Sequence, residues 1–241
     1  MSNHVLIRLG VVLALTPVGH LVADCGWLPG DGVPEVGDSA RATTVWDNGN
    51  GPALYVGGDF TVAGNVVVNR IARWNGTTWS PLGNGLGGWV HALSVYNGEL
   101  IAGGEFTTAG GVSATYIARW NGASWAPLGT GSGMNDQVSA LTVYNGELIA
   151  GGEFTTAGGV SADHNARWNG TSWAPLGTGM SGGRDPFMHA LTVYNGELIA
   201  GGWFTTAGGV SVKRIVKWDG TNWCSAHRNL RDCQPNERNS S

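Results

Sequence analysis

The chain has 241 residues, of which only 12% are charged, and a formal net charge of −4. This low, slightly acidic charge leaves no basic stripe for nucleic-acid phosphates or anionic lipid, so nucleic acid is not expected as a partner. Glycine accounts for 41 residues and tryptophan for 12, well above ordinary usage, which is roughly 7% for glycine. Many tight turns and many large apolar rings are therefore expected.

Residues 1–23 have the pattern of an export signal. Arg8 supplies a weak positive start, residues 9–15 are apolar, and Ala23 is a small residue suited to cleavage. The apolar run is too short to span a bilayer, so no membrane span is expected after signal removal. The alternative is that this run forms a buried first strand. The export pattern predicts a secreted or cell-surface protein, with the periplasm as another location.

Three cysteines, Cys25, Cys224 and Cys233, are present, and cysteines of exported proteins tend to pair. Residues 25–32 follow the predicted signal, and within them residues 27–32 resemble the last-strand pattern of residues 173–179. We expect this extra outer strand to complete or compete for the last blade of the array described next, which would place Cys25 near Cys224. The alternative is a bridge between Cys224 and Cys233.

The rest of the chain is built on one segment. Residues 140–152 recur letter for letter at 190–202 and in altered form at 92–104 and 42–58. Their closing glycines, Gly58, Gly104, Gly152 and Gly202, are spaced by 46, 48 and 50 residues, a period typical of a four-stranded propeller blade. The sequence predicts four blades, at about 40–86, 90–131, 138–179 and 188–223, in a domain covering 24–223.

Each repeat contains four short apolar runs separated by turn residues. In the third repeat we expect strands at 139–144, 147–154, around 165–168, and at 173–177, with Asn145-Gly146 as a two-residue hairpin. No stretch has sustained helical periodicity. The predicted fold is all-β, a small closed propeller or an open array of four-stranded blades.

Residues common to the repeats are interpreted as scaffold. We expect the second and third strands to pair with Glu153 opposite Arg167 and with Trp168 over Gly152, because the same 14-residue separation recurs in every repeat. A carboxylate repeated in several blades is more consistent with a cross-strand pair than with a catalytic acid. The predicted structural residues are Gly103, Gly104, Trp120, Trp125, Gly151, Gly152, Glu153, Arg167, Trp168 and Trp173.

The joint occurrence of Gly-Gly, Trp-Asn-Gly and Trp-x-x-Leu-Gly at fixed spacing, over roughly residues 25–223, resembles the kelch-like repeats of secreted bacterial β-propeller proteins. It is also similar to repeats of fungal cortical cell-polarity markers. The resemblance implies a propeller and implies little about activity.

The pattern ends after Trp223. Residues 224–241 form a polar tail rich in Arg and Asn, which is typical of disorder. The alternative is that the chain is a fragment, or is out of frame beyond Trp223.

Function is expected where the repeats differ. The turns within each hairpin are nearly constant, whereas the connections between blades, and those from second to third strand, are unlike one another. Both kinds of connection leave an up-and-down blade on one face, and loops on a rigid scaffold commonly carry binding groups. The alternative is drift in unconstrained loops. The candidate ligand-binding residues are Trp89, Tyr116, Asp136, His164, Arg184, Asp185 and Phe187.

No catalytic constellation is found, so an enzyme is not expected. The histidines His91, His164, His189 and His227 are scattered, and His91 and His189 occupy equivalent loop positions that are more typical of solvent-facing side chains. Closely spaced acids for calcium are absent, and no cofactor or metal is predicted. The sequence favours a non-catalytic binding module for an extracellular glycan or protein, with a structural or adhesive surface repeat as the alternative. A kelch-scaffold oxidase or a glycosidase-like enzyme is the less favoured third interpretation.

Overall fold

The computed structural model describes residues 35–129 and 133–226, and the backbone of four short strands near the N-terminus. These strands are β1 (Ile7–Leu9), β2 (Val12–Leu15), β3 (Leu21–Asp24) and β4 (Trp27–Pro29). β4 was expected to complete the last blade, but it pairs with β1. The predicted tail lies largely outside the described residues. Cys224 is disulfide-bonded; Cys25 and Cys233 lie outside the described residues, so pairing of Cys25 with Cys224 stays a prediction.

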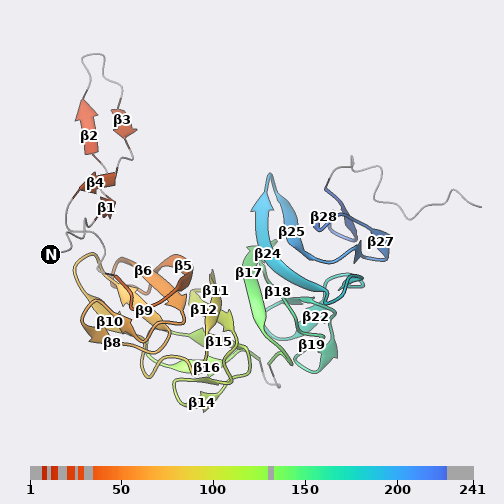
Figure 1. The fold of residues 1–241 in the computed structure, drawn as a ribbon, viewed down its shortest axis with the longest axis horizontal. Coiled ribbons are helices and arrows are strands. Elements are labelled where there is room, and N and C mark those ends of the chain that lie inside the picture. Colours follow the sequence, from red (N-terminus) through yellow and green to blue (C-terminus); the bar gives the residue numbers. More distant parts are fainter. Residues whose placement is uncertain are drawn as a thin grey trace, which may run out of the picture.

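Four antiparallel sheets of four strands form the body of the protein (Figure 1). Within each blade the strands, called a to d, follow one another in space as they do in the sequence. Blade 1 contains β5 (Ala40–Asp47), β6 (Pro52–Gly58), β9 (Ile71–Trp74) and β10 (Trp79–Pro81). Blade 2 contains β11 (Val90–Tyr96), β12 (Glu99–Gly104), β15 (Ile117–Trp120) and β16 (Trp125–Pro127). Blade 3 contains β17 (Val138–Tyr144), β18 (Glu147–Gly152), β21 (Asn165–Trp168) and β22 (Trp173–Pro175). Blade 4 contains β24 (Phe187–Tyr194), β25 (Glu197–Trp203), β28 (Ile215–Trp218) and β29 (Trp223–Ser225).

The described residues contain strands and turns but no helix, which confirms the all-β prediction. It follows that none of them belongs to a helix long and apolar enough to cross a membrane.

A small hairpin interrupts each blade between strands b and c. The four hairpins are β7–β8 (Val62–Ala63, Val66–Val67), β13–β14 (Thr108–Ala109, Val112–Ser113), β19–β20 (Thr156–Ala157, Val160–Ser161) and β26–β27 (Thr206–Ala207, Val210–Ser211). Each hairpin pairs with the connection that precedes its own blade, through Val36–Ala63, Leu86–Ala109, Met134–Ala157 and β23 (Met180–Ser181) with β26. The inter-blade connections and the b–c hairpins therefore share one face, as predicted. We call it the loop face and the opposite one the turn face.

The predicted register between strands b and c is wrong. Arg167 lies opposite Ile149, and Trp168 lies opposite Leu148, not Gly152. The reason is that residues 154–163 fold back as their own hairpin, so pairing of the long strands begins only at Gly151 and Asn165.

The ion pairs shift with this register. Arg167 Nη1 lies 3.4 Å from Glu147 Oε2, a glutamate at the turn face, rather than facing Glu153. The equivalent contacts are 3.1 Å for Arg119–Glu99 and 2.9 Å for Lys217–Glu197. The two half-exposed arginine pairs add little to stability, about 0–1 kcal/mol each, so they do not hold the blades together; Lys217 of the third pair is buried.

The Gly-Gly pair also has a different role from the one expected. A Cβ added to Gly103 would lie 2.6 Å from Val138 Cγ1, a side chain of the next blade. Gly104 and Gly152 instead allow the backbone that leads into strand a to approach closely. An added Cβ at these glycines would collide with the carbonyls of Trp89 and Gln137. The first glycine thus makes room for the neighbouring blade and the second for the start of strand a.

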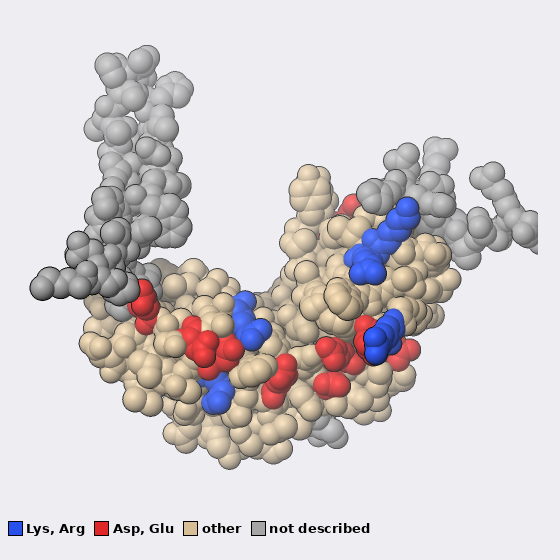
Figure 2. Space-filling view, viewed as in Figure 1, with Lys and Arg blue, Asp and Glu red and all other residues tan. Residues whose placement is uncertain are grey.

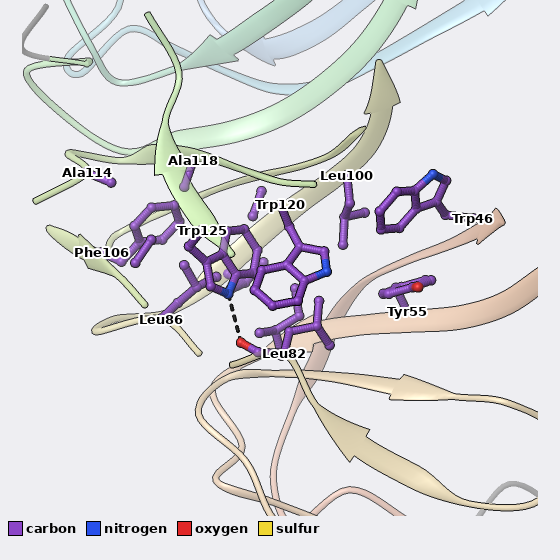
Figure 3. Close-up of a cluster of buried hydrophobic side chains, with 14 of the residues drawn as sticks. Trp46, Tyr55, Leu82, Leu86, Leu100, Phe106, Ala114, Ala118, Trp120 and Trp125 are labelled. Carbon is purple, nitrogen blue, oxygen red and sulfur yellow. Dashed lines mark hydrogen bonds between the residues drawn. The ribbon is translucent and has the colours of Figure 1, made fainter. Parts of the chain in front are cut away.

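The hydrophobic core lies mainly between blades. One cluster joins Trp46, Tyr55 and Leu82 of blade 1 to Trp120 and Trp125 of blade 2 (Figure 3). The two tryptophan rings lie 5.3 Å apart, and Trp125 Nε1 donates a 2.8 Å hydrogen bond to the Leu82 carbonyl. Equivalent clusters join blade 2 to blade 3 and blade 3 to blade 4. Each blade is therefore stabilised by its neighbours in the chain.

The four blades form an open arc (Figure 1). Blade 1 and blade 4 stand at the two ends of the arc, and the space-filling view shows a hollow between them (Figure 2). Of the two predicted alternatives, a closed propeller and an open array, this structure has the second.

Candidate ligand-binding hollow on the loop face

A β-bulge interrupts strand a of every blade close to its start. The bulged residues are Arg41, His91, Ser139 and His189. A bulge inserts an unpaired residue and re-aims its side chain, and bulges are common beside functional sites. The four blades thus direct four residues, of three different types, toward the loop face from one structural position.

In each blade, the residue that follows the Gly-Gly pair of strand b lies beside the residue two positions before the bulged one. The Glu105 amide donates to the Trp89 carbonyl at 2.9 Å, and the Glu153 amide donates to the Gln137 carbonyl at 3.1 Å. In blade 4 the strands extend one step further, so Phe187 pairs directly with Trp203. This geometry places the end of strand b next to the bulge in each blade.

Each blade fills these positions with a different pair. Arg41 Nη2 lies 3.1 Å from Asp59 Oδ2, and His91 Nε2 lies 3.0 Å from Glu105 Oε1. In blade 3, Gln137 Nε2 donates to Glu153 Oε1 at 2.6 Å. The Arg41 hydrogen bond holds the pKa of Asp59 below its usual value, and in return raises the pKa of Arg41. Charged and amide groups are therefore paired and held in place.

Blade 4 replaces the ion pair with aromatic rings. The His189 ring lies 4.1 Å from Phe187 and 6.5 Å from Trp203, centroid to centroid. Trp203 is 59% exposed, and the Arg214 guanidinium lies 5.8 Å from its centre. Blade 4, at one end of the four equivalent positions, thus presents apolar surface.

These positions converge on one hollow of about 360 Å³ that draws on all four blades. Its lining residues are Arg41, His91, Glu105, Gln137, Ser139, Glu153, Phe187 and His189. Trp89 stands at the margin, 42% exposed, with the Arg41 guanidinium 5.2 Å from its ring centre. Acidic and basic side chains are interspersed along the arc in Figure 2, so the hollow carries groups of both signs.

A larger cavity of about 550 Å³ lies on the turn face between blades 2 and 3. It is lined by Tyr96, Asn97, Glu99 and Arg119, among others. The same residue types recur in the next blade as Tyr144, Asn145, Glu147 and Arg167. Repetition of its lining identifies this cavity as a consequence of the scaffold, whereas each blade contributes a different combination of residues to the loop-face hollow.

The structure brings together only some of the predicted ligand-binding residues. Phe187 lines the hollow and Trp89 stands beside it. Asp136 is exposed next to this region and accepts a 2.7 Å hydrogen bond from the Gln137 amide. Arg184 and Asp185 are exposed on the connection before β24 and do not line the hollow.

The other two predicted residues, Tyr116 and His164, have backbone roles. Tyr116 packs partly against the core between blades 2 and 3, and His164 is buried. Both have positive φ, 64° and 67°, as do Arg70 and Arg214 at the equivalent positions. The His164 amide donates to the Phe154 carbonyl at 2.9 Å and its carbonyl accepts from the Gly152 amide at 3.1 Å. These two bonds hold the left-handed backbone in place.

The hollow includes residues that sequence reasoning did not select. Arg41, Glu105, Gln137 and Ser139 were not considered as ligand-binding, and Glu153 was interpreted as scaffold alone. His91 and His189 were recognised as equivalent but expected to face solvent away from a site. The signal for them in the sequence is that the residues at fixed positions near the start of strand a and after the Gly-Gly pair vary among the repeats, whereas the strands between are nearly constant.

No group of three or more His, Cys, Asp or Glu side chains able to hold a metal ion occurs in residues 35–129 and 133–226. The arrangement presents paired polar groups and exposed rings, which are groups that bind and orient a ligand.

The family model described as a domain of unknown function (DUF5122) beta-propeller matches residues 97–122 and 195–217. No curated protein matches this sequence. A matching solved structure is the crystal structure of the computationally designed Ika8 protein, which is 16% identical with a TM-score of 0.36. That match covers 78% of this chain, and the chain spans 60% of the Ika8 chain. The family match and the four-stranded antiparallel blades agree on a β-propeller repeat protein.

Proposed function

We propose that this chain is a non-catalytic binding module whose loop face takes a carbohydrate ligand. The observation that carries the proposal is the convergence of equivalent but chemically different residues from all four blades on one hollow. A scaffold position that repeats in structure and varies in chemistry is where ligand specificity is placed on a rigid frame.

The chemistry of the hollow suits a sugar. A sugar ring has an apolar C–H face that can stack on an aromatic ring and hydroxyl groups that need both donors and acceptors. Trp89 and Trp203 supply exposed rings, while Gln137, Glu105 and His91 supply fixed donors and acceptors. The low net charge of −4 favours a neutral ligand over a polyanion.

An extracellular glycan ligand would accord with the export pattern of residues 1–23, and we propose secretion or display at the cell surface on that basis. The rival function is a structural or adhesive repeat with no discrete ligand, which is favoured by the near-identity of blades 2 and 3. The two proposals differ in whether the hollow is needed for binding.

The first prediction concerns the exposed rings. A screen of neutral oligosaccharides on an array identifies a ligand, and calorimetry measures its affinity for the wild type and for Trp89→Ala with Trp203→Ala. Loss of one anchoring ring costs about 2 kcal/mol, so the double variant, which loses two, is expected to bind at least roughly 30-fold more weakly. Val45→Ala, a change at a side chain 64% exposed near the turn-face end of β5, is the control and should leave affinity unchanged.

A second pair of variants, at two glutamates, tests whether the ligand binds the loop face or the turn face. Glu105→Gln alters the His91 partner in the hollow and is expected to weaken binding, whereas Glu99→Gln, the carboxylate paired with Arg119 on the turn face, is not. A ligand whose affinity ignores the tryptophans and Glu105 would reject the hollow. Absence of any glycan ligand would favour the adhesive repeat.

A further inference from the structure

The outer faces of blades 1 and 4 correspond to the two surfaces that pack together wherever consecutive blades meet. Such an interface occurs three times within the described molecule. At each internal interface one blade presents a face with a glycine slot, which we call the acceptor face. The next blade presents the apolar side chains that pack into it, which we call the donor face. Between blades 2 and 3 the acceptor face contains Tyr96, Ile101, Gly103 and Ile117, and the donor face contains Val138, Leu141, Leu148 and Trp168. The same positions in blades 1 and 4 have no such neighbour on their outer sides among residues 35–129 and 133–226.

A glycine forms the slot at the centre of each acceptor face. An added Cβ would lie 2.5 Å from Val90 Cγ1 at Gly57 and 2.6 Å from Val138 Cγ1 at Gly103. At Gly151 it would collide with the side chain of Met188. The equivalent Gly201 of blade 4 is open, since the nearest described atom is the Arg214 carbonyl oxygen at 3.8 Å.

The rest of the acceptor face of blade 4 is exposed and apolar. Ile117 is fully buried in blade 2, whereas its equivalent Ile215 is 42% exposed. Tyr96 is 6% exposed and its equivalent Tyr194 is 66% exposed. Terminal repeats of stacked arrays usually carry a polar outer face that caps the array. The outer face of blade 4 keeps the apolar residues of an internal interface, so it is built to be covered.

The opposite end of the arc carries the donor half. Leu54, Val56, Trp74 and Trp79 of blade 1 form their own cluster, and they occupy the positions that Leu148, Ala150, Trp168 and Trp173 occupy in blade 3. Leu54 and Trp74 are only partly buried, while Leu148 and Trp168 are buried.

The projecting side chains of this donor half are smaller than at the internal interfaces. Ala40 and Thr43 stand where blade 3 has Val138 and Leu141. The end face of blade 1 therefore matches the end face of blade 4 in position, with less apolar surface at the projecting residues.

We propose that the acceptor face of blade 4 binds the donor face of blade 1 of a second copy, and the reverse, giving a closed head-to-tail dimer. A heterologous contact of this kind forms a ring when its rotation closes. Two arcs of four blades give eight blades, which is within the range of known propellers, and blades 1 and 4 stand at opposite ends of the open arc (Figure 1). The occupant is a copy of this chain because the contact continues the internal interface residue by residue.

The test measures the mass of the intact protein by light scattering after size exclusion. The wild type is expected at twice the 25.1 kDa of one chain. Gly201→Val fills the open slot with its Cβ no closer than 3.8 Å to any described atom of its own chain, and a β-branched residue suits a strand. It should therefore give a folded monomer with an unchanged circular dichroism spectrum. Gly103→Val places the same side chain against Val138 and is the matched control that should instead destabilise the fold.

A gain-of-association variant keeps the test independent of loss of folding. Ala40→Val restores the projecting side chain that blades 2 and 3 carry at this position. The added apolar surface at the two joints should lower the dimer dissociation constant by on the order of tenfold or more. Sedimentation across a dilution series measures this constant.

Three results would overturn the proposal. The first is a wild-type mass of one chain at every concentration, as would follow if another part of this chain covered blade 4. The second is a dimer that is insensitive to Gly201→Val, and the third is a mass that grows with concentration beyond two chains.

Discussion

At the scale of single residues, the loop face depends on four non-glycine residues with left-handed backbone: Arg70, Tyr116, His164 and Arg214. Such a backbone costs on the order of 1 kcal/mol or more for most side chains. The two main-chain hydrogen bonds on either side of His164 show what retains it. Because the constraint is in the backbone, the side chain at this position is free to vary among the blades. Variation here was interpreted from the sequence as a sign of ligand binding.

His164 makes stability depend on pH. Burial lowers the pKa of this histidine, against the opposing effects of the Gly152 backbone and of Asp163, and its buried Nδ1 has no hydrogen-bond partner among the described residues. The unfolded chain therefore binds a proton more readily than the folded one, and stability should fall as pH drops from about 7 through the ordinary histidine pKa near 6.5.

The measurement is urea unfolding at pH 7.5 and pH 5.0. His164→Asn removes the titrating group, and asparagine tolerates positive φ, so the loss of stability between the two pH values should shrink. An unchanged pH dependence in His164→Asn would contradict the assignment. The depressed pKa of Asp59 acts in a separate, more acidic window, below the ordinary aspartate value.

At the scale of elements, strand d tryptophans connect consecutive blades by a hydrogen bond that is not uniform. Trp125 and Trp223 donate to the carbonyls of Leu82 and Leu176 in the preceding blade. Trp173 Nε1 is buried and has no acceptor among the described residues. Tryptophans at equivalent positions of the sequence thus differ in whether their Nε1–H group has a hydrogen-bond acceptor.

Phenylalanine substitution should separate them. Trp125→Phe loses a hydrogen bond, while the Leu82 carbonyl keeps its 3.0 Å bond from the Gly85 amide. The loss should therefore cost about 0.5–1.5 kcal/mol beyond the loss of ring area. Trp173→Phe loses similar area but removes an unsatisfied group. Denaturant titration should show Trp125→Phe as the less stable variant by at least about 0.5 kcal/mol. Equal losses would mean that the Trp125 bond contributes nothing net.

The elements show how far the sequence could predict the structure. Period, turn residues and apolar runs were sufficient for four blades of four strands, because these signals are local. The register of β18 against β21 was not, because the twelve residues between them could form either one long connection or the observed hairpin. The bulges at Arg41, His91, Ser139 and His189 leave no mark in the alternation of apolar residues, so the hollow they create was missed. The role of Gly103 depends on Val138 in another blade, a contact that no pattern within one repeat reveals.

At the scale of the whole molecule, contacts join each blade to the next in the chain, and the core is divided into clusters at the junctions. Stability in such an array is approximately a sum of blade terms and nearest-neighbour interface terms. The weakest junction then decides whether the blades unfold together. The central junction, between blades 2 and 3, is the one that divides the arc into equal halves.

Gly103→Val should uncouple these halves. The new side chain meets Val138 of the next blade, and overpacking of this kind costs roughly 1–3 kcal/mol. That cost falls on the interface term alone, so calorimetric unfolding should broaden or split, and amide protection should drop in β12 and β17 before the outer blades are affected. Ala126→Val adds apolar volume on the half-buried outer strand of the same blade and should leave a single transition. A single sharp transition at the wild-type midpoint for Gly103→Val would show that the blades are coupled by more than the contact between Gly103 and Val138.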